Sequence, residues 1–142
     1  MSELIVPGIL IAICTVSDIM TRTLPVWLIG LGGVVAASVS YALGALSIVQ
    51  ILFGVMLGGV IFLFAFFSKQ SVGYGDALLF MAIGAGIGVF REVFLMWTSF
   101  LAAGLFGVIL MIIRHKSKDY ELPFVPFLSA AYALMVCMEG LA

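Results

Sequence analysis

The stretch LSIVQILFGVMLGGVIFLFAFF, residues 46–67, contains no charged residue. It is long enough to cross a lipid bilayer, because a spanning helix needs about 20 apolar residues for a hydrocarbon core of roughly 30 Å. The rest of the chain has the same character: 65% of its 142 residues are hydrophobic and 9% are charged. Soluble domains carry about 25% charged residues. The composition therefore predicts an integral membrane protein.

Charged and turn-forming residues divide the chain into six apolar segments, at about residues 4–17, 25–43, 46–67, 77–90, 93–113 and 123–138. The intervening loops are short, so we expect one transmembrane domain over residues 1–142, a bundle of six helices. No positively charged region precedes the first segment, which we interpret as a retained helix and not a signal peptide. Glycines four residues apart, at 54 and 58 and at 84 and 88, predict close helix contacts in lipid.

The basic residues predict the orientation of this bundle. If the N-terminus is outside, five of the six basic residues lie in cytoplasmic loops: Arg22, Lys69, Arg114, Lys116 and Lys118. Such an excess is the usual mark of the cytoplasmic side. Outside remain Arg91 and the acidic Glu3, Glu92 and Glu139. We therefore expect both termini outside and loops 18–24, 68–76 and 114–122 in the cytoplasm.

Several functional classes are disfavoured by the composition. The net charge of −1 argues against a nucleic-acid partner, which requires a basic face. Cys14 and Cys137 form no C-x-x-C pair, so neither a zinc site nor a disulfide is implied. We interpret both as small buried hydrophobic residues.

Two aspartates are expected at similar depth in the membrane. Asp18 follows Glu3 by 15 residues, and Asp76 precedes Arg91 by 15 residues. At 1.5 Å per residue, each helix rises about 22 Å between its outer charge and its aspartate. Both carboxylates then lie several ångströms below the cytoplasmic edge, where they form a candidate dyad.

A carboxylate dyad can perform aspartic-protease chemistry. Two carboxylates that share a site cannot easily both ionise, so one accepts a proton from water while the other polarises a peptide carbonyl. Gly73 and Gly75 would leave room beside Asp76 for a substrate backbone.

Other interpretations of the same residues stay open at this point. Asp76 could be a helix N-cap, and Asp18 could pair with Arg22 one turn further on. A small ion-coupled transporter would also use intramembrane carboxylates. A non-catalytic assembly protein of a secretion system is a third class.

Three motifs occur in order along the chain: DIMTRTLPVW at residues 18–27, GYGD at 73–76 and LPFVPFL at 122–128. Together they resemble the D-x3-R-x2-P, G-x-G-D and P-F-x-P-F segments of bacterial type IV prepilin peptidases. The similarity covers essentially the whole chain.

The resemblance implies an intramembrane aspartic endopeptidase in the bacterial inner membrane, with Asp18 and Asp76 as catalytic residues. It would cleave the basic leader from a prepilin or pseudopilin at the cytoplasmic face, without a metal or a cofactor. Residues expected to bind substrate or support the site are Arg22, Gly73, Tyr74, Gly75, Pro123 and Pro126. Tyr74 could either pack at the membrane interface or form a hydrogen bond near the dyad.

The chain also departs from the family pattern. Val26 replaces a usual asparagine, Leu78 a frequent lysine, and Val125 a common glycine, which affects the polar surroundings of the dyad and the substrate preference. Long members insert a cysteine-rich domain, associated with N-methylation of the product, after the first helix. Only about six residues join Asp18 to Pro25, so this chain resembles the short, peptidase-only members, such as those that serve tight-adherence pili.

Overall fold

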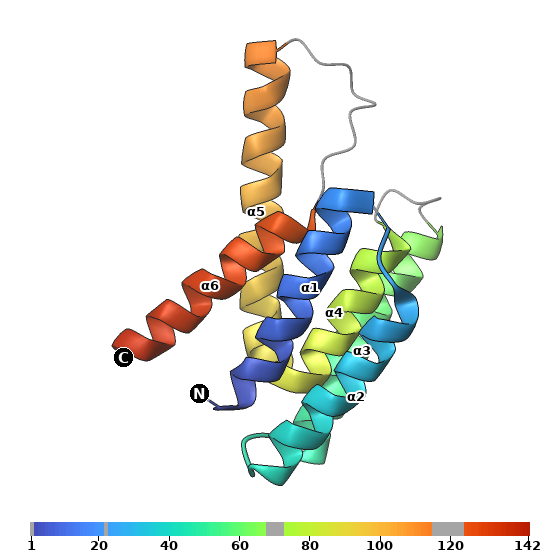
Figure 1. The fold of residues 1–142 in the computed structure, drawn as a ribbon, viewed down its shortest axis with the longest axis vertical. Coiled ribbons are helices and arrows are strands. Elements are labelled where there is room, and N and C mark those ends of the chain that lie inside the picture. The colour runs from blue at the N-terminus through green and yellow to red at the C-terminus, as the bar shows by residue number, and fades with distance from the viewer. Residues whose placement is uncertain (1, 22, 68–72, 115–123) are drawn as a thin grey trace.

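The structure of the protein is a computed structural model that describes residues 2–21, 23–67, 73–114 and 124–142 (Figure 1). The described part is helical, as the sequence predicts. A short 3-10 turn, η1 (Ser2–Leu4), precedes the α-helices α1 (Ile5–Thr21), α2 (Val26–Ala42), α3 (Ile48–Phe67), α4 (Tyr74–Ile87), α5 (Val89–Arg114) and α6 (Val125–Leu141).

Three of the described helical stretches are long and apolar enough to cross a membrane: Ser2–Thr21, Ile48–Phe67 and Val89–Ile113. The helices Val26–Ala42, Tyr74–Ile87 and Val125–Leu141 are apolar but shorter. The protein is therefore a multi-pass membrane protein. Many large apolar side chains of the long helices face outward, including Phe64 and Ile112, as expected for surfaces in contact with lipid.

The boundaries of α4 and α5 differ from the predicted segments 77–90 and 93–113. Only Gly88 separates the two helices, and its φ of 81° lies in the left-handed region that glycine tolerates best. This turn reverses the chain within one residue. The charged pair Arg91 and Glu92, interpreted from the sequence as a loop, consequently lies in the first turn of α5.

Helix α4 lies at the centre of the bundle, in contact with α2 and α3 on one side and with α1 and α5 on the other (Figure 1). Nine of its fourteen residues are buried. Because α4 is apolar around its whole circumference, it is stable only when other helices surround it. The buried cluster centred on Phe80 and Ile83 extends from α4 to α1 and α6.

Small residues allow this close packing around α4, as predicted. A Cβ atom added to Gly54 of α3 would overlap the carbonyl group of Gly84, and one added to Gly58 would lie 2.5 Å from the Met81 Cα. On the other side, the Ser40 hydroxyl of α2 donates a hydrogen bond of 2.6 Å to the Gly86 carbonyl. Backbone contact of this kind stabilises helix association where lipid provides no hydrophobic driving force.

Glu92, counted from the sequence among the charges of the outer side, is not exposed. Its side chain is 0% exposed and packs against Gly84, where an added Cβ would overlap the carboxyl group. Neither carboxyl oxygen has a hydrogen-bond partner among the residues that the structure describes. The missing side chain of Gly84 creates the space into which Glu92 folds.

An ion cluster joins the two ends of the chain to α5. Arg91 Nη1 lies 3.0 Å from Glu3 Oε1, and Arg91 Nε lies 2.7 Å from Glu139 Oε1. The Tyr132 hydroxyl of α6 also donates a hydrogen bond of 2.5 Å to the Leu4 carbonyl. The N-terminus, the start of α5 and the end of α6 therefore lie at the same end of the molecule.

We expect Gly54→Ala to destabilise the fold by about 1–3 kcal/mol, the usual cost of overpacking. The reason is the overlap of the new methyl group with the Gly84 backbone. Gly59→Ala is the matched control on the same helix, because no atom lies within 4 Å of its Cβ position, and it should be neutral or slightly stabilising. Unfolding in mixed micelles measures both variants. Equal stabilities would contradict the packing described for α3 and α4.

Candidate active site

Asp18 lies near the C-terminal end of α1 and is 9% exposed. The backbone N–H of Val125, the first residue of α6, donates a hydrogen bond of 3.3 Å to its Oδ2 atom. The contact joins residues 107 positions apart in the sequence. The third motif is thereby brought directly to the first.

Asp76 lies in the first turn of α4 and is half-buried. The N-cap of this helix is Gly73, without a side-chain cap hydrogen bond, so the interpretation of Asp76 as the N-cap is wrong. A Cβ atom added to Gly73 would lie 3.0 Å from Asp76 Oδ2. Gly73 thus leaves the space beside this carboxyl group open, with an ordinary φ of −62°.

The two aspartates lie close enough for the charge of Asp18 to act on the Asp76 carboxyl group. Both come from the same end of the bundle, where α1 ends and α4 begins (Figure 1). This is the end opposite to the cluster of Arg91, Glu3 and Glu139. The arrangement agrees with the similar depth that the sequence predicts for the two carboxylates.

Aromatic rings fill the core next to the dyad. The Phe80 ring lies 6.0 Å from the rings of both Phe100 and Phe124, and these last two are 5.2 Å apart. The three rings belong to α4, α5 and the residue that precedes α6. They hold the start of α6 against the helix that carries Asp76.

The structure places the remaining predicted site residues as follows. Gly75 packs against Leu24, whose Cδ1 atom would lie 2.9 Å from an added Cβ. The Tyr74 ring packs against Phe62 with a centroid distance of 5.8 Å. Pro126 is half-buried within the first two positions of α6. Arg22 and Pro123 lie outside the described residues.

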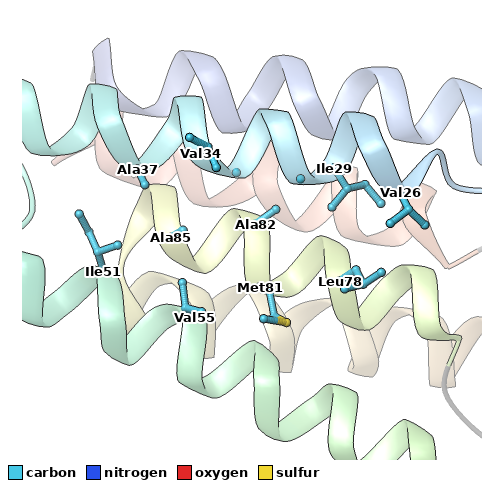
Figure 2. Close-up of a pocket in the computed structure, with 12 residues that line it drawn as sticks. Val26, Ile29, Val34, Ala37, Ile51, Val55, Leu78, Met81, Ala82 and Ala85 are labelled. Carbon is cyan, nitrogen blue, oxygen red and sulfur yellow. The ribbon is translucent and has the colours of Figure 1, made fainter.

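Two departures from the family pattern, Val26 and Leu78, line one apolar pocket of about 370 Å³ between α2, α3 and α4. Figure 2 shows them at the same end of the pocket. Leu78 follows Asp76 by two residues, so the two side chains point about 200° apart around a helix of 3.6 residues per turn. The pocket therefore opens on the face of α4 that is turned away from the carboxyl group of Asp76.

The site brings together the carboxyl groups of Asp18 and Asp76. Among the described residues, no group of three or more histidine, cysteine, aspartate and glutamate side chains could hold a metal ion. Carboxyl groups such as those of Asp18 and Asp76 can exchange protons with each other and with water.

Sequence reasoning missed the N–H group of Val125 as a part of this site. The signal was present in the two prolines of LPFVPFL, because a proline in the first turn marks the start of a helix, where backbone N–H groups have no partner in the helix. The sequence does not show which neighbouring helix the start of α6 faces.

Comparison with known proteins identifies the family of the chain. Residues 4–112 match the model of the type IV leader peptidase family, and the chain therefore belongs to that family. This confirms the family resemblance; the matched range contains the first two motifs, and the third, at residues 122–128, lies beyond it.

Two curated relatives share part of the chain. It is 33% identical over 63 residues to a prepilin leader peptidase/N-methyltransferase of Aeromonas salmonicida, covering 44% of this chain and 22% of the relative. It is 34% identical over 73 residues to the Legionella pneumophila protein of the same description, covering 51% and 23%. The matched region thus spans less than a quarter of the length of these relatives. No solved structure matches the chain significantly.

Proposed function

We propose that this chain is an intramembrane aspartic endopeptidase, with residues 1–142 forming one transmembrane peptidase domain. Its substrate is a prepilin or pseudopilin whose basic leader it removes at the cytoplasmic face of the bacterial inner membrane. The observation that carries the proposal is the pair Asp18 and Asp76. Two carboxyl groups from separate helices interact electrostatically at one end of the bundle, in a chain of the type IV leader peptidase family.

In the proposed reaction the dyad holds one proton between two carboxyl groups. The ionised aspartate takes a proton from water as the water oxygen attacks the scissile carbonyl carbon, and the protonated aspartate donates its proton to the carbonyl oxygen. The tetrahedral intermediate then collapses. The leaving nitrogen receives the proton taken from water, the other aspartate recovers its own, and the C–N bond breaks.

The position of the dyad relative to α5 supports cleavage within the apolar zone of the membrane. The Phe100 ring of α5 contacts the Phe124 ring next to Val125. Fourteen further residues of α5, which rise about 21 Å, lead to Arg114 at the end of the helix. Figure 1 shows this part of α5 extending past the ends of α1 and α4. A peptide that enters from the cytoplasm would therefore meet the dyad within the apolar zone.

The proposed orientation has six crossings and both termini outside. Its support is the positive-inside excess of the sequence together with the ion cluster that gathers Glu3, Arg91 and Glu139. We further propose that the chain does not methylate its product. Only residues 22–25 join α1 to α2, so no cysteine-rich domain is inserted between these helices.

The burial of Glu92 keeps the ion-coupled transporter as a second candidate. A carboxyl group inside a membrane protein often marks an ion or proton path, and Glu92 is 0% exposed. Ion flux into proteoliposomes that Glu92→Gln abolishes would support the transporter, whereas cleavage of a prepilin without flux supports the peptidase.

We expect Asp18→Asn and Asp76→Asn each to abolish cleavage, because an amide can neither accept a proton from water nor donate an acidic proton to the carbonyl oxygen. Purified variants are tested with a synthetic prepilin, and the product is identified by sequencing its new N-terminus. Both variants should elute from size exclusion like the parent protein. A chelator should leave the activity of the parent unchanged. Near-normal cleavage by either variant would remove that aspartate from the dyad.

Gly73→Ala should lower kcat about tenfold to a hundredfold, since small displacements of a catalytic group have effects of that size. The backbone at Gly73, with φ −62° and ψ 133°, suits alanine, so the expected effect arises from the methyl group beside Asp76 Oδ2. Gly59→Ala, on the outer side of α3, provides the comparison. If the kcat values of the two variants were equal, the space at Gly73 would have no catalytic role.

The orientation can be tested with single cysteines in a background without Cys14 and Cys137. An impermeant thiol reagent should label Ser2→Cys and Leu141→Cys in spheroplasts, because both termini face outward. Thr23→Cys, in the exposed linker after α1, should react only after the membrane is permeabilised. The reverse pattern would place the dyad on the outer side and contradict leader cleavage in the cytoplasm.

A further inference from the structure

The first turn of α6 presents one backbone N–H group to the dyad. Phe124 is the N-cap of α6 and makes no side-chain cap hydrogen bond. Val125 follows as the first helical residue, and its N–H donates to Asp18 Oδ2. Pro126 has no N–H group, and the N–H groups of Phe127 and Leu128 donate to the Phe124 carbonyl. Val125 is thus the donor of this turn that reaches Asp18.

The contact is electrostatically favourable for an ionised Asp18. The N-terminus of a helix carries a partial positive charge, and an N–H bond to a carboxylate favours the ionised form of the carboxyl group. Helix α6 spans 17 residues, so its dipole is fully developed. Asp18 therefore serves as the missing cap of α6, provided from a different helix.

Asp76 lies in a different environment. It is half-buried, and its Oδ2 atom lies over Gly73, at a position where a side chain would crowd it. The charge of Asp18 acts on it, and two carboxylates this close do not both ionise readily. When Asp18 is the ionised member of the pair, Asp76 is the one that retains the proton.

We propose that Val125 is a positioning residue whose backbone N–H holds Asp18 ionised, so that Asp18 is the general base and Asp76 the general acid. The inference rests on the peptidase function proposed above and assigns the two roles that the dyad alone leaves interchangeable. In the attack step Asp18 takes the proton of water, and Asp76 gives its proton to the scissile carbonyl oxygen. In the collapse step Asp18 passes its proton to the leaving nitrogen, and Asp76 regains its own.

The hydrogen bond to Asp18 does not depend on which side chain stands at position 125, because its donor is the backbone N–H. Valine stands where the family has a common glycine, yet the N–H group is the same in both residues. The Val125 side chain is 0% exposed and belongs to the hydrophobic core. It anchors the N-terminus of α6 in place, and this departure from the family pattern preserves the bond to Asp18.

The test replaces Val125 by its α-hydroxy acid through nonsense suppression, which exchanges the N–H for an ester oxygen and retains the side chain. Hydrogen bonds to charged groups contribute about 1.5–3 kcal/mol, which corresponds to roughly one to two pH units. We expect the acidic limb of the kcat profile to move to higher pH by about that amount, with KM for a synthetic prepilin little changed. The same exchange at Phe127, whose N–H donates within α6, is the matched control and should not move the profile.

Two further titratable groups near Asp18 could also influence the pH profile. Cys14, one turn earlier on α1, and Asp76 both interact electrostatically with Asp18. The profile is therefore also recorded in Cys14→Ala, where the effect of the ester should persist. An unshifted acidic limb in the Val125 ester would overturn the role of the N–H group, even if Asp18→Asn and Asp76→Asn are inactive and the peptidase function stands.

Infrared difference spectroscopy tests the roles of the aspartates without any change at Val125. In a Glu92→Gln background, which removes the buried third carboxyl group, the parent should show the band of a protonated carboxylic acid. The band should disappear in Asp76→Asn, because the N–H of Val125 keeps Asp18 ionised. Persistence of the band in Asp76→Asn, or its absence from the parent, would overturn the assignment of base and acid.

Discussion

The close contact of α4 with α2 and α3 is the constraint on which the rest of the structure depends. Helix α4 is apolar on all sides and carries Asp76 in its first turn. In lipid, such a helix is held by van der Waals packing and by backbone contact at small residues. Gly54 and Gly58 of α3 provide that contact against Gly84 and Met81. If α4 were displaced, the carboxyl group of Asp76 would lose its place beside the end of α1.

The charged groups of the described helices are separated into two ends. At one end Arg91 forms ion pairs with Glu3 and Glu139, so three segments are tied together there. At the other end Asp18 and Asp76 share a site in which a helix N-terminus faces Asp18. Between them lies an apolar core with Glu92 as the buried exception. In the proposed orientation, the ion-paired end faces outward and the end with the two aspartates faces the cytoplasm, which suits an enzyme whose substrate arrives from that side.

Much of this architecture could be predicted because the membrane restricts the choices. Apolar runs form helices in lipid, so six helices and a similar depth of Asp18 and Asp76 could be predicted. The same reasoning failed at Arg91 and Glu92, which it placed in a loop. A single left-handed glycine, Gly88, turns the chain there, and the small size of Gly84 permits the burial of Glu92. The turn at Gly88 and the burial of Glu92 depend on which residues lie nearby in the folded protein. Sequence periodicity and charge counts do not describe these neighbours.

The Val125 contact shows why side-chain motifs describe only part of a membrane active site. In an apolar bundle, the polar groups nearest to a catalytic carboxylate are often backbone groups at helix ends, because every other N–H group is used within its helix. A motif records which side chains recur, whereas the N–H group of Val125 is shared by every residue type except proline. A helix that begins beside an aspartate can therefore favour the ionised form of that aspartate through a backbone N–H group, which a sequence motif does not show. The departure of Val125 from the family pattern then changes the packing of the site more than its electrostatics.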